Sequence, residues 1–128
     1  MIKLIIKGLP PMLLNSRMTW VSKARAANEW YGRTLVALHK AKAPLGQPLR
    51  RALVVYVRHS GSRQPDKDNL VSSFKWIQDA LVYAGVLHGD SMYDIETEYR
   101  WKPASPKDGR VSIWIIPSVK SPANSAES

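Results

Sequence analysis

The sequence predicts one α+β domain, a four-stranded mixed sheet with its helices packed mainly on one face. Three observations support this fold class. The 128 residues, 45% of them hydrophobic, are enough for one core but not for two. Four short segments alternate like strands, and two longer ones have apolar residues at helical spacing. Their order is β-α-β-α-β-β, so a right-handed crossover should leave the first two strands parallel.

Residues 2–7 should form the first strand, because apolar side chains alternate there with mostly charged ones. The Pro-Pro pair that follows ends it, since proline has no N–H for a neighbouring strand. The first helix is expected from about Ser22, its candidate N-cap, to the basic residues Lys40 and Lys42.

Residues 53–58 should form the second strand, which is rich in β-branched side chains and should be broken from His59 onward. A single second helix is expected from Asn69 to Tyr83, with Gly85 as its stop signal. A polar loop therefore separates this strand from this helix.

The last two strands are expected at residues 95–101 and 111–115, paired antiparallel across a turn. The domain should span residues 1–117. Residues 118–128 are mostly small or polar, and we expect them to be a disordered tail.

The net charge of +9 favours a polyanionic partner, DNA or RNA first and an acidic membrane surface second. The chain has no Cys, which excludes disulfides and thiolate-bound zinc. The apolar segment at residues 2–7 is too short, and too interrupted by Lys, for a signal peptide or a membrane span. We therefore expect a cytoplasmic protein with no membrane insertion.

Two carboxylates, Asp66 and Asp68, stand directly before the second predicted helix. In an extended segment, residues i and i+2 point the same way, so both side chains could aim at one point. Asp90 adds a third carboxylate after the helix. Three such oxygen ligands suit Mg²⁺, with Mn²⁺ as a substitute. An acidic metal site within a basic surface is what a nuclease needs, although Asp68 could instead simply cap the helix.

The segment Asp66-Lys67-Asp68-Asn69-Leu70 is followed by Lys75, by Asp79-Ala80-Leu81 and by Asp90. This ordered set resembles the core pattern of the RusA-type Holliday junction resolvases. The resemblance spans residues 2–116 in element order, and its specific part is confined to residues 65–91. The Pro-Pro pair, followed by Asn15 and Arg17, is similar to the entry segment of that family.

The resemblance implies a small, Mg²⁺-dependent, homodimeric endonuclease that cuts four-way or related branched DNA, of a kind often carried by phages. No small-molecule cofactor is implied. By the same resemblance, Asp66, Asp68 and Asp90 are the catalytic metal ligands and Lys75 is the catalytic lysine. Ser72 stands where the family has that lysine, as if about one helical turn were inserted before Lys75.

Gly89 is a second departure, because the family usually has an acid at that position. Two other functional classes therefore stay open. One is a catalytically inactive DNA-binding module of the same fold, and the other is a basic accessory protein that binds RNA or a protein partner.

Phosphate contacts are expected from polar side chains around the start of each helix. These residues are Asn15, Arg17, Lys23, Arg25, Arg63, Lys67 and Asn69. A four-way junction has near two-fold symmetry, so a two-fold homodimer would match it. The expected dimer contacts are Tyr99, Trp101 and Trp114, or Trp30 and Tyr31.

Overall fold

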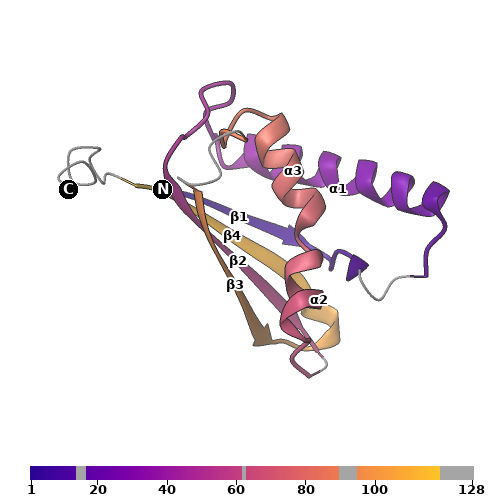
Figure 1. Ribbon diagram of the computed structural model, residues 1–128. Coiled ribbons are helices and arrows are strands. Elements are labelled where there is room, and N and C mark those ends of the chain that lie inside the picture. Colours follow the sequence, from indigo (N-terminus) through magenta and orange to yellow (C-terminus); the bar gives the residue numbers. More distant parts are fainter. Residues whose placement is uncertain (14–16, 62, 90–94, 119–128) are drawn as a thin grey trace.

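The computed structural model describes residues 1–13, 17–61, 63–89 and 95–118. Its helices lie on one side of a four-stranded sheet (Figure 1), which confirms the predicted α+β class. A 3-10 turn, Pro106–Asp108, connects the last two strands. The other elements are β1 (Ile2–Lys7), α1 (Trp20–Lys40), β2 (Ala52–Ser60), α2 (Lys67–Ser72), α3 (Lys75–Tyr83), β3 (Ile95–Pro103) and β4 (Arg110–Pro117).

The strand order is β1-β4-β2-β3, so the predicted hairpin between the last two strands is wrong. β4 lies between β1 and β2 and is antiparallel to both, whereas β3 pairs with β2 in parallel. β1 and β2 therefore run in the same direction, as predicted, without being neighbours. β3 carries exposed charges at Glu96, Glu98 and Arg100, which suit an edge strand, while β4 is largely buried.

The core lies between the sheet and the helices. Alternation in β1 is confirmed, because Leu4 and Ile6 are buried while Lys3, Ile5 and Lys7 are exposed. The largest fully buried side chains of this core are Leu4, Leu38, Val54, Tyr56, Phe74, Ile77, Leu81, Val86, Val111, Ile113 and Ile115.

Two predicted boundaries are wrong. Thr19, not Ser22, is the N-cap of α1, because its Oγ1 accepts the Ser22 N–H at 3.1 Å. β2 does not break at His59 but continues to Ser60. His59 lies opposite Lys102 of β3 and Arg110 of β4, so strands on both sides extend β2.

The predicted second helix is divided into α2 and α3. The Ser72 hydroxyl donates to the Asn69 carbonyl at 2.9 Å, and the Ser73 hydroxyl donates to the Leu70 carbonyl at 2.8 Å. Such local bonds compete with the helical pattern of the backbone. Phe74 then leaves helical geometry, with φ −102° and ψ 4°, and α3 begins at the next residue.

Gly85 ends α3 as predicted, with φ +77°. The Gly85 N–H donates to the Val82 carbonyl at 3.0 Å, and the Val86 N–H donates to the Leu81 carbonyl at 2.9 Å. This pair of bonds satisfies carbonyls that the helix itself leaves free. α1 ends in the same way at Lys42, which adopts φ +56° although it has a side chain.

Candidate active site

The first two predicted ligands lie at the start of α2. Asp66 is the N-cap residue, and its carbonyl accepts the Leu70 N–H at 2.9 Å. Asp68 lies within the first turn of the helix, so the expected extended geometry for this pair is wrong. Successive helical residues are about 100° apart, and convergence must therefore come from side-chain rotation.

Both carboxylates are exposed and uncommitted. Asp66 makes no side-chain capping bond, and within the described residues neither Asp66 nor Asp68 has a hydrogen-bond or ion-pair partner. Capping therefore does not account for either side chain. Asp90, the third expected ligand, lies outside the described residues. In residues 1–13, 17–61, 63–89 and 95–118, no three His, Asp or Glu side chains gather closely enough to hold a metal ion.

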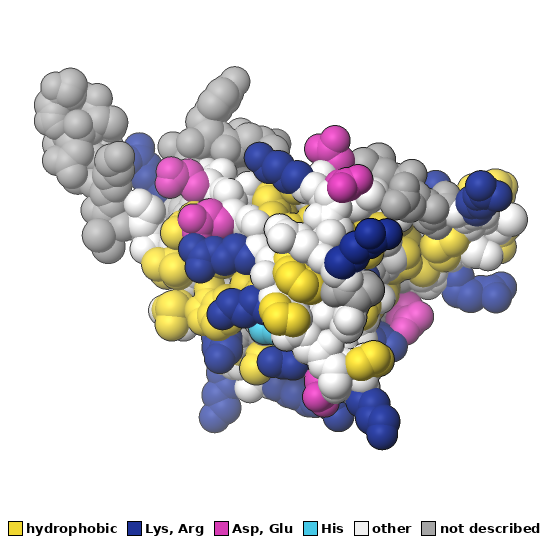
Figure 2. Space-filling model, turned by 90° about the horizontal axis from the view of Figure 1, so that it is seen from below, with side chains coloured by type: hydrophobic (Ala, Val, Ile, Leu, Met, Phe, Trp, Pro, Cys, Tyr) yellow, Lys and Arg dark blue, Asp and Glu magenta, His cyan; other side chains and the backbone are white. Residues whose placement is uncertain are grey.

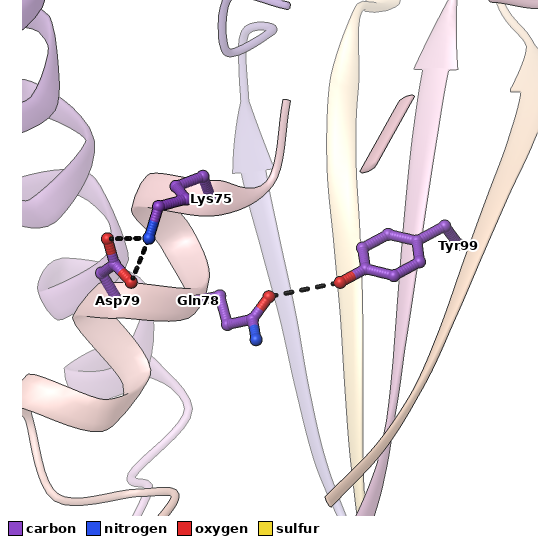
Figure 3. Close-up of polar contacts among 4 residues, drawn as sticks. All are labelled: Lys75, Gln78, Asp79 and Tyr99. Atoms are coloured by element: carbon purple, nitrogen blue, oxygen red, sulfur yellow. Dashed lines mark hydrogen bonds and ion pairs between the residues drawn. The ribbon is translucent and has the colours of Figure 1, made fainter. Parts of the chain in front are cut away.

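Lys75 is the first residue of α3 and is held along that helix. Its Nζ lies 3.2 Å from both carboxylate oxygens of Asp79 (Figure 3). The Lys75 side chain is 64% exposed, and the pair lies on the surface. Asp68 and Lys75 lie on two different helices, α2 and α3, so they are not related by extra turns of one continuous helix as expected.

Aromatic packing fixes the α2–α3 break on the sheet. The ring of Phe74 lies 5.0 Å from the ring of Tyr56, which in turn stacks on Tyr99 at 5.1 Å. The Tyr99 hydroxyl donates to the Gln78 side-chain oxygen at 3.2 Å (Figure 3). These contacts fix the positions of α2 and α3 above β2 and β3.

The Tyr56 hydroxyl is buried, and the described residues offer it no hydrogen-bond partner. Burial, with smaller effects of Tyr99 and Asp79, raises the pKa of this hydroxyl far above its ordinary value. Tyr56 is therefore a packing residue that stays neutral.

Arg58 is a buried charge that the sequence analysis missed. It follows Val54 and Tyr56 on the helix-facing side of β2, where a charged residue is rare. Its Nη1 donates to the Pro10 carbonyl at 2.7 Å, while its Nε has no partner among the described residues. Burial lowers the pKa of the guanidinium. An Arg in the core-facing register was the signal that could have identified it.

The predicted phosphate contacts fall into two groups. One group surrounds the start of α1, and the other surrounds the start of α2. β1 and β2 run in the same direction, so both groups lie at the end of the sheet where these strands finish (Figure 1). Arg17, Arg25, Arg63 and Lys67 are exposed, Lys23 and Asn69 are half-buried, and Asn15 is outside the described residues.

No helix in the described part of the chain is long and apolar enough to cross a membrane. The chain matches no protein-family model and no curated protein, so the likeness to resolvases is carried by the motif order alone.

Proposed function

We propose that the protein is a metal-dependent endonuclease that hydrolyses phosphodiester bonds in four-way or related branched DNA. The observation that carries this proposal is the pair of exposed, uncommitted carboxylates, Asp66 and Asp68, at the start of α2. They stand beside two basic residues, Arg63 in the preceding loop and Lys67 at the first position of α2, in a chain of net charge +9. The motif order shared with RusA-type resolvases points to the same activity.

The donor set fits Mg²⁺ in its chemistry, because carboxylate oxygens without protein partners are the ligands this ion prefers. Asp66, Asp68 and Asp90 would hold it, with Mn²⁺ as a substitute. A bound divalent ion supplies an activated water and neutralises charge on the phosphoryl oxygens. Arg63 and Lys67 would hold the flanking phosphates by charge-assisted hydrogen bonds.

Lys75 would leave the Asp79 carboxylate and contact a phosphate oxygen of the substrate instead. An exposed ion pair is worth at most about 1 kcal/mol, so this exchange costs little. The Lys75–Asp79 contact is therefore compatible with a role in catalysis.

A two-fold homodimer would supply the second site that a symmetric junction requires. Trp30 is only 4% exposed and belongs to the core, so it is not a dimer contact. Trp101 and Trp114 are half-buried and remain the proposed contacts, but as alternatives. Trp101 pairs with the helix-facing Arg58, whereas Trp114 pairs with Val55 on the opposite face of the sheet. Sedimentation of micromolar protein tests the dimer, and a monomer that still makes paired symmetric cuts would contradict it.

Cleavage of a synthetic four-way junction with Mg²⁺ tests the activity. Asp68→Asn should lower the cleavage rate by about 100-fold or more, because even residues that only support a metal ligand cost about 10- to 100-fold when changed. Junction binding without metal should persist. The matched control is Glu96→Gln, which removes one exposed carboxylate on β3 and should cut normally. Equal rates for Asp68→Asn and wild type would refute the metal site.

An inactive DNA-binding module is the second candidate. The observation that favours it is the engagement of the Lys75 ammonium by Asp79, together with Ser72 at the usual lysine position. Junction binding by the wild type, without cleavage in Mg²⁺ or Mn²⁺, would establish this alternative.

A further inference from the structure

A row of basic side chains crosses the sheet face opposite the helices. The strand register places Lys102 of β3 opposite His59 of β2, His59 opposite Arg110 of β4, and Arg110 opposite Lys7 of β1. Directly opposite residues in neighbouring strands share one face of a sheet. Arg58, next to His59, packs on the helix side, so this row leaves the sheet on the other side.

One end of the row borders a hollow of about 460 Å³. The hollow lies between residues 7–9 and the segment 106–110, which are joined by the Gly8 N–H donating to the Gly109 carbonyl at 2.9 Å. Lys107 adds a further cation to its rim. The space is open to solvent and is wide enough for a phosphate group.

Positive charge exceeds negative charge at this place, because Lys7, Lys107 and Arg110 line the hollow together with one acidic residue, Asp108. Arg110 donates to the main-chain carbonyl of Asp108 at 3.1 Å, which holds the guanidinium without an opposing charge. The Asp108 carboxylate accepts the Ser105 hydroxyl at 2.8 Å. Within the described residues, Lys7, Lys102, Lys107 and Arg110 form no ion pair. Figure 2 shows Lys and Arg side chains along the lower border of its view, with few acidic ones among them.

His59 completes the row in a neutral form. Its side chain is buried, with Nε2 3.1 Å from the Ser112 hydroxyl oxygen. Burial, and then the charges of Arg110 and Lys102, lower its pKa. The imidazole can therefore donate or accept a hydrogen bond at neutral pH without adding to the repulsion among the cations.

We infer that this open-face basic site, formed by Lys7, His59, Lys102, Lys107 and Arg110, binds the phosphodiester backbone of duplex DNA. Four strands at about 4.8 Å spacing make the row about 14 Å long. Duplex DNA carries one charge per about 1.7 Å of axis, so such a row faces several phosphates at once. A small anion would occupy only the hollow.

This site lies on a different face from the acidic site but at the same end of the sheet, because His59 is followed by the loop that leads to Asp66. The inference rests on the proposed function in taking DNA as the substrate. It adds that a second arm of a branched substrate binds across the open face while another arm lies at α2.

The test is binding of a fluorescein-labelled duplex, measured by anisotropy without divalent metal and at several salt concentrations. Lys7→Glu and Lys107→Glu should each weaken binding about 10-fold and lower the salt slope by about 0.9. The matched control is Lys3→Glu, the same change on the same strand and face. It lies about 13 Å from Lys7, beyond the screening length of about 8 Å at physiological salt. We expect it to change binding by less than about 2-fold.

Equal losses in Lys3→Glu and Lys7→Glu would reduce the effect to net charge and overturn the inference. So would wild-type affinity in both Lys7→Glu and Lys107→Glu, with folding checked by circular dichroism. Binding of phosphatidylserine vesicles in place of duplex would also overturn it. The outcome is separate from cleavage: site-dependent duplex binding by a protein that never cuts junctions would reject only the proposed nuclease.

Discussion

The ammonium nitrogen of Lys75 lies 3.2 Å from each of the two carboxylate oxygens of Asp79, which is one turn further along α3. Because this ion pair is exposed, the proposed catalytic role of Lys75 can be tested without a large change in protein stability. Lys75→Gln should change the free energy of unfolding by less than about 0.5 kcal/mol, because the pair is exposed. Junction cleavage should nevertheless fall about 100-fold if Lys75 contacts the reacting phosphate.

Asp79→Asn is the companion variant for Lys75. It breaks the same ion pair but leaves the ammonium free, so cleavage should be unchanged or faster. Urea unfolding and junction cleavage are measured on both variants. Normal cleavage by Lys75→Gln would show that Lys75 has no role in catalysis and only forms a surface ion pair.

The two stacked tyrosines should respond differently to loss of their hydroxyls. Tyr99→Phe removes a bond to Gln78 and should lower the free energy of unfolding by about 0.5–1.5 kcal/mol. Tyr56→Phe removes a buried hydroxyl that has no partner in the described residues, and should be neutral or stabilising. Urea unfolding compares the two variants, and a larger loss for Tyr56→Phe would reveal a partner for that hydroxyl.

Replacing Lys42, just after α1, with glycine should increase the stability of the protein. Its φ of +56° is costly for any residue with a Cβ, so Lys42→Gly should stabilise the protein by about 0.5–1 kcal/mol. Lys40→Gly, at the last residue of α1, is the control and should destabilise by up to about 1 kcal/mol. Thermal unfolding measures both, and destabilisation by Lys42→Gly would contradict the left-handed cap.

His59 should make stability fall in acid. Its pKa is lowered in the folded protein, so the unfolded chain binds the proton more readily. The stability that neutral His59 contributes is complete at pH values above its ordinary pKa of 6.5. It is lost as the pH falls through the lowered pKa of the folded protein. The charged groups nearest on its face of the sheet are Lys102 and Arg100 of β3 and Arg110 of β4.

The measurement is urea unfolding between neutral pH and about pH 5. His59→Gln should give a shallower pH dependence than wild type over this range. His39→Gln, at an exposed position on α1, should keep the wild-type slope. Identical slopes for wild type and His59→Gln would remove His59 as the source.

Local patterns predicted the elements that depend on local physics. Alternation identified β1, and the conformational freedom of Gly85 identified the end of α3. Strand pairing and helix continuity instead depend on contacts between segments that are separated in the sequence. The position of β4 between β1 and β2 depends on which strand tolerates an exposed edge, and the alternation of residues 95–101 resembles that of any other strand.

The position of the two candidate ligands near the start of a helix was predicted, but their conformation was not. Asp66 and Asp68 were both expected in an extended segment before the helix, whereas the helix begins at Lys67 and carries Asp68 in its first turn. The break at Phe74 depends on burial against Tyr56, which is far away in sequence. The open-face basic site was not predicted, because its members come from separate strands and meet only through the sheet register.

The position of β4 also determines the order in which the chain can fold. β1, at the beginning of the sequence, has β4 as its neighbour in the sheet, and its pairing of Ile2 with Ile115 closes a loop of more than 100 residues. During synthesis β1 must therefore wait until residues 110–117 have left the ribosome. Such long-range closure slows folding, and a nascent chain that stops before β4 cannot build the sheet. The open-face row of basic side chains, which includes Arg110, is thus complete only after β4 has been made.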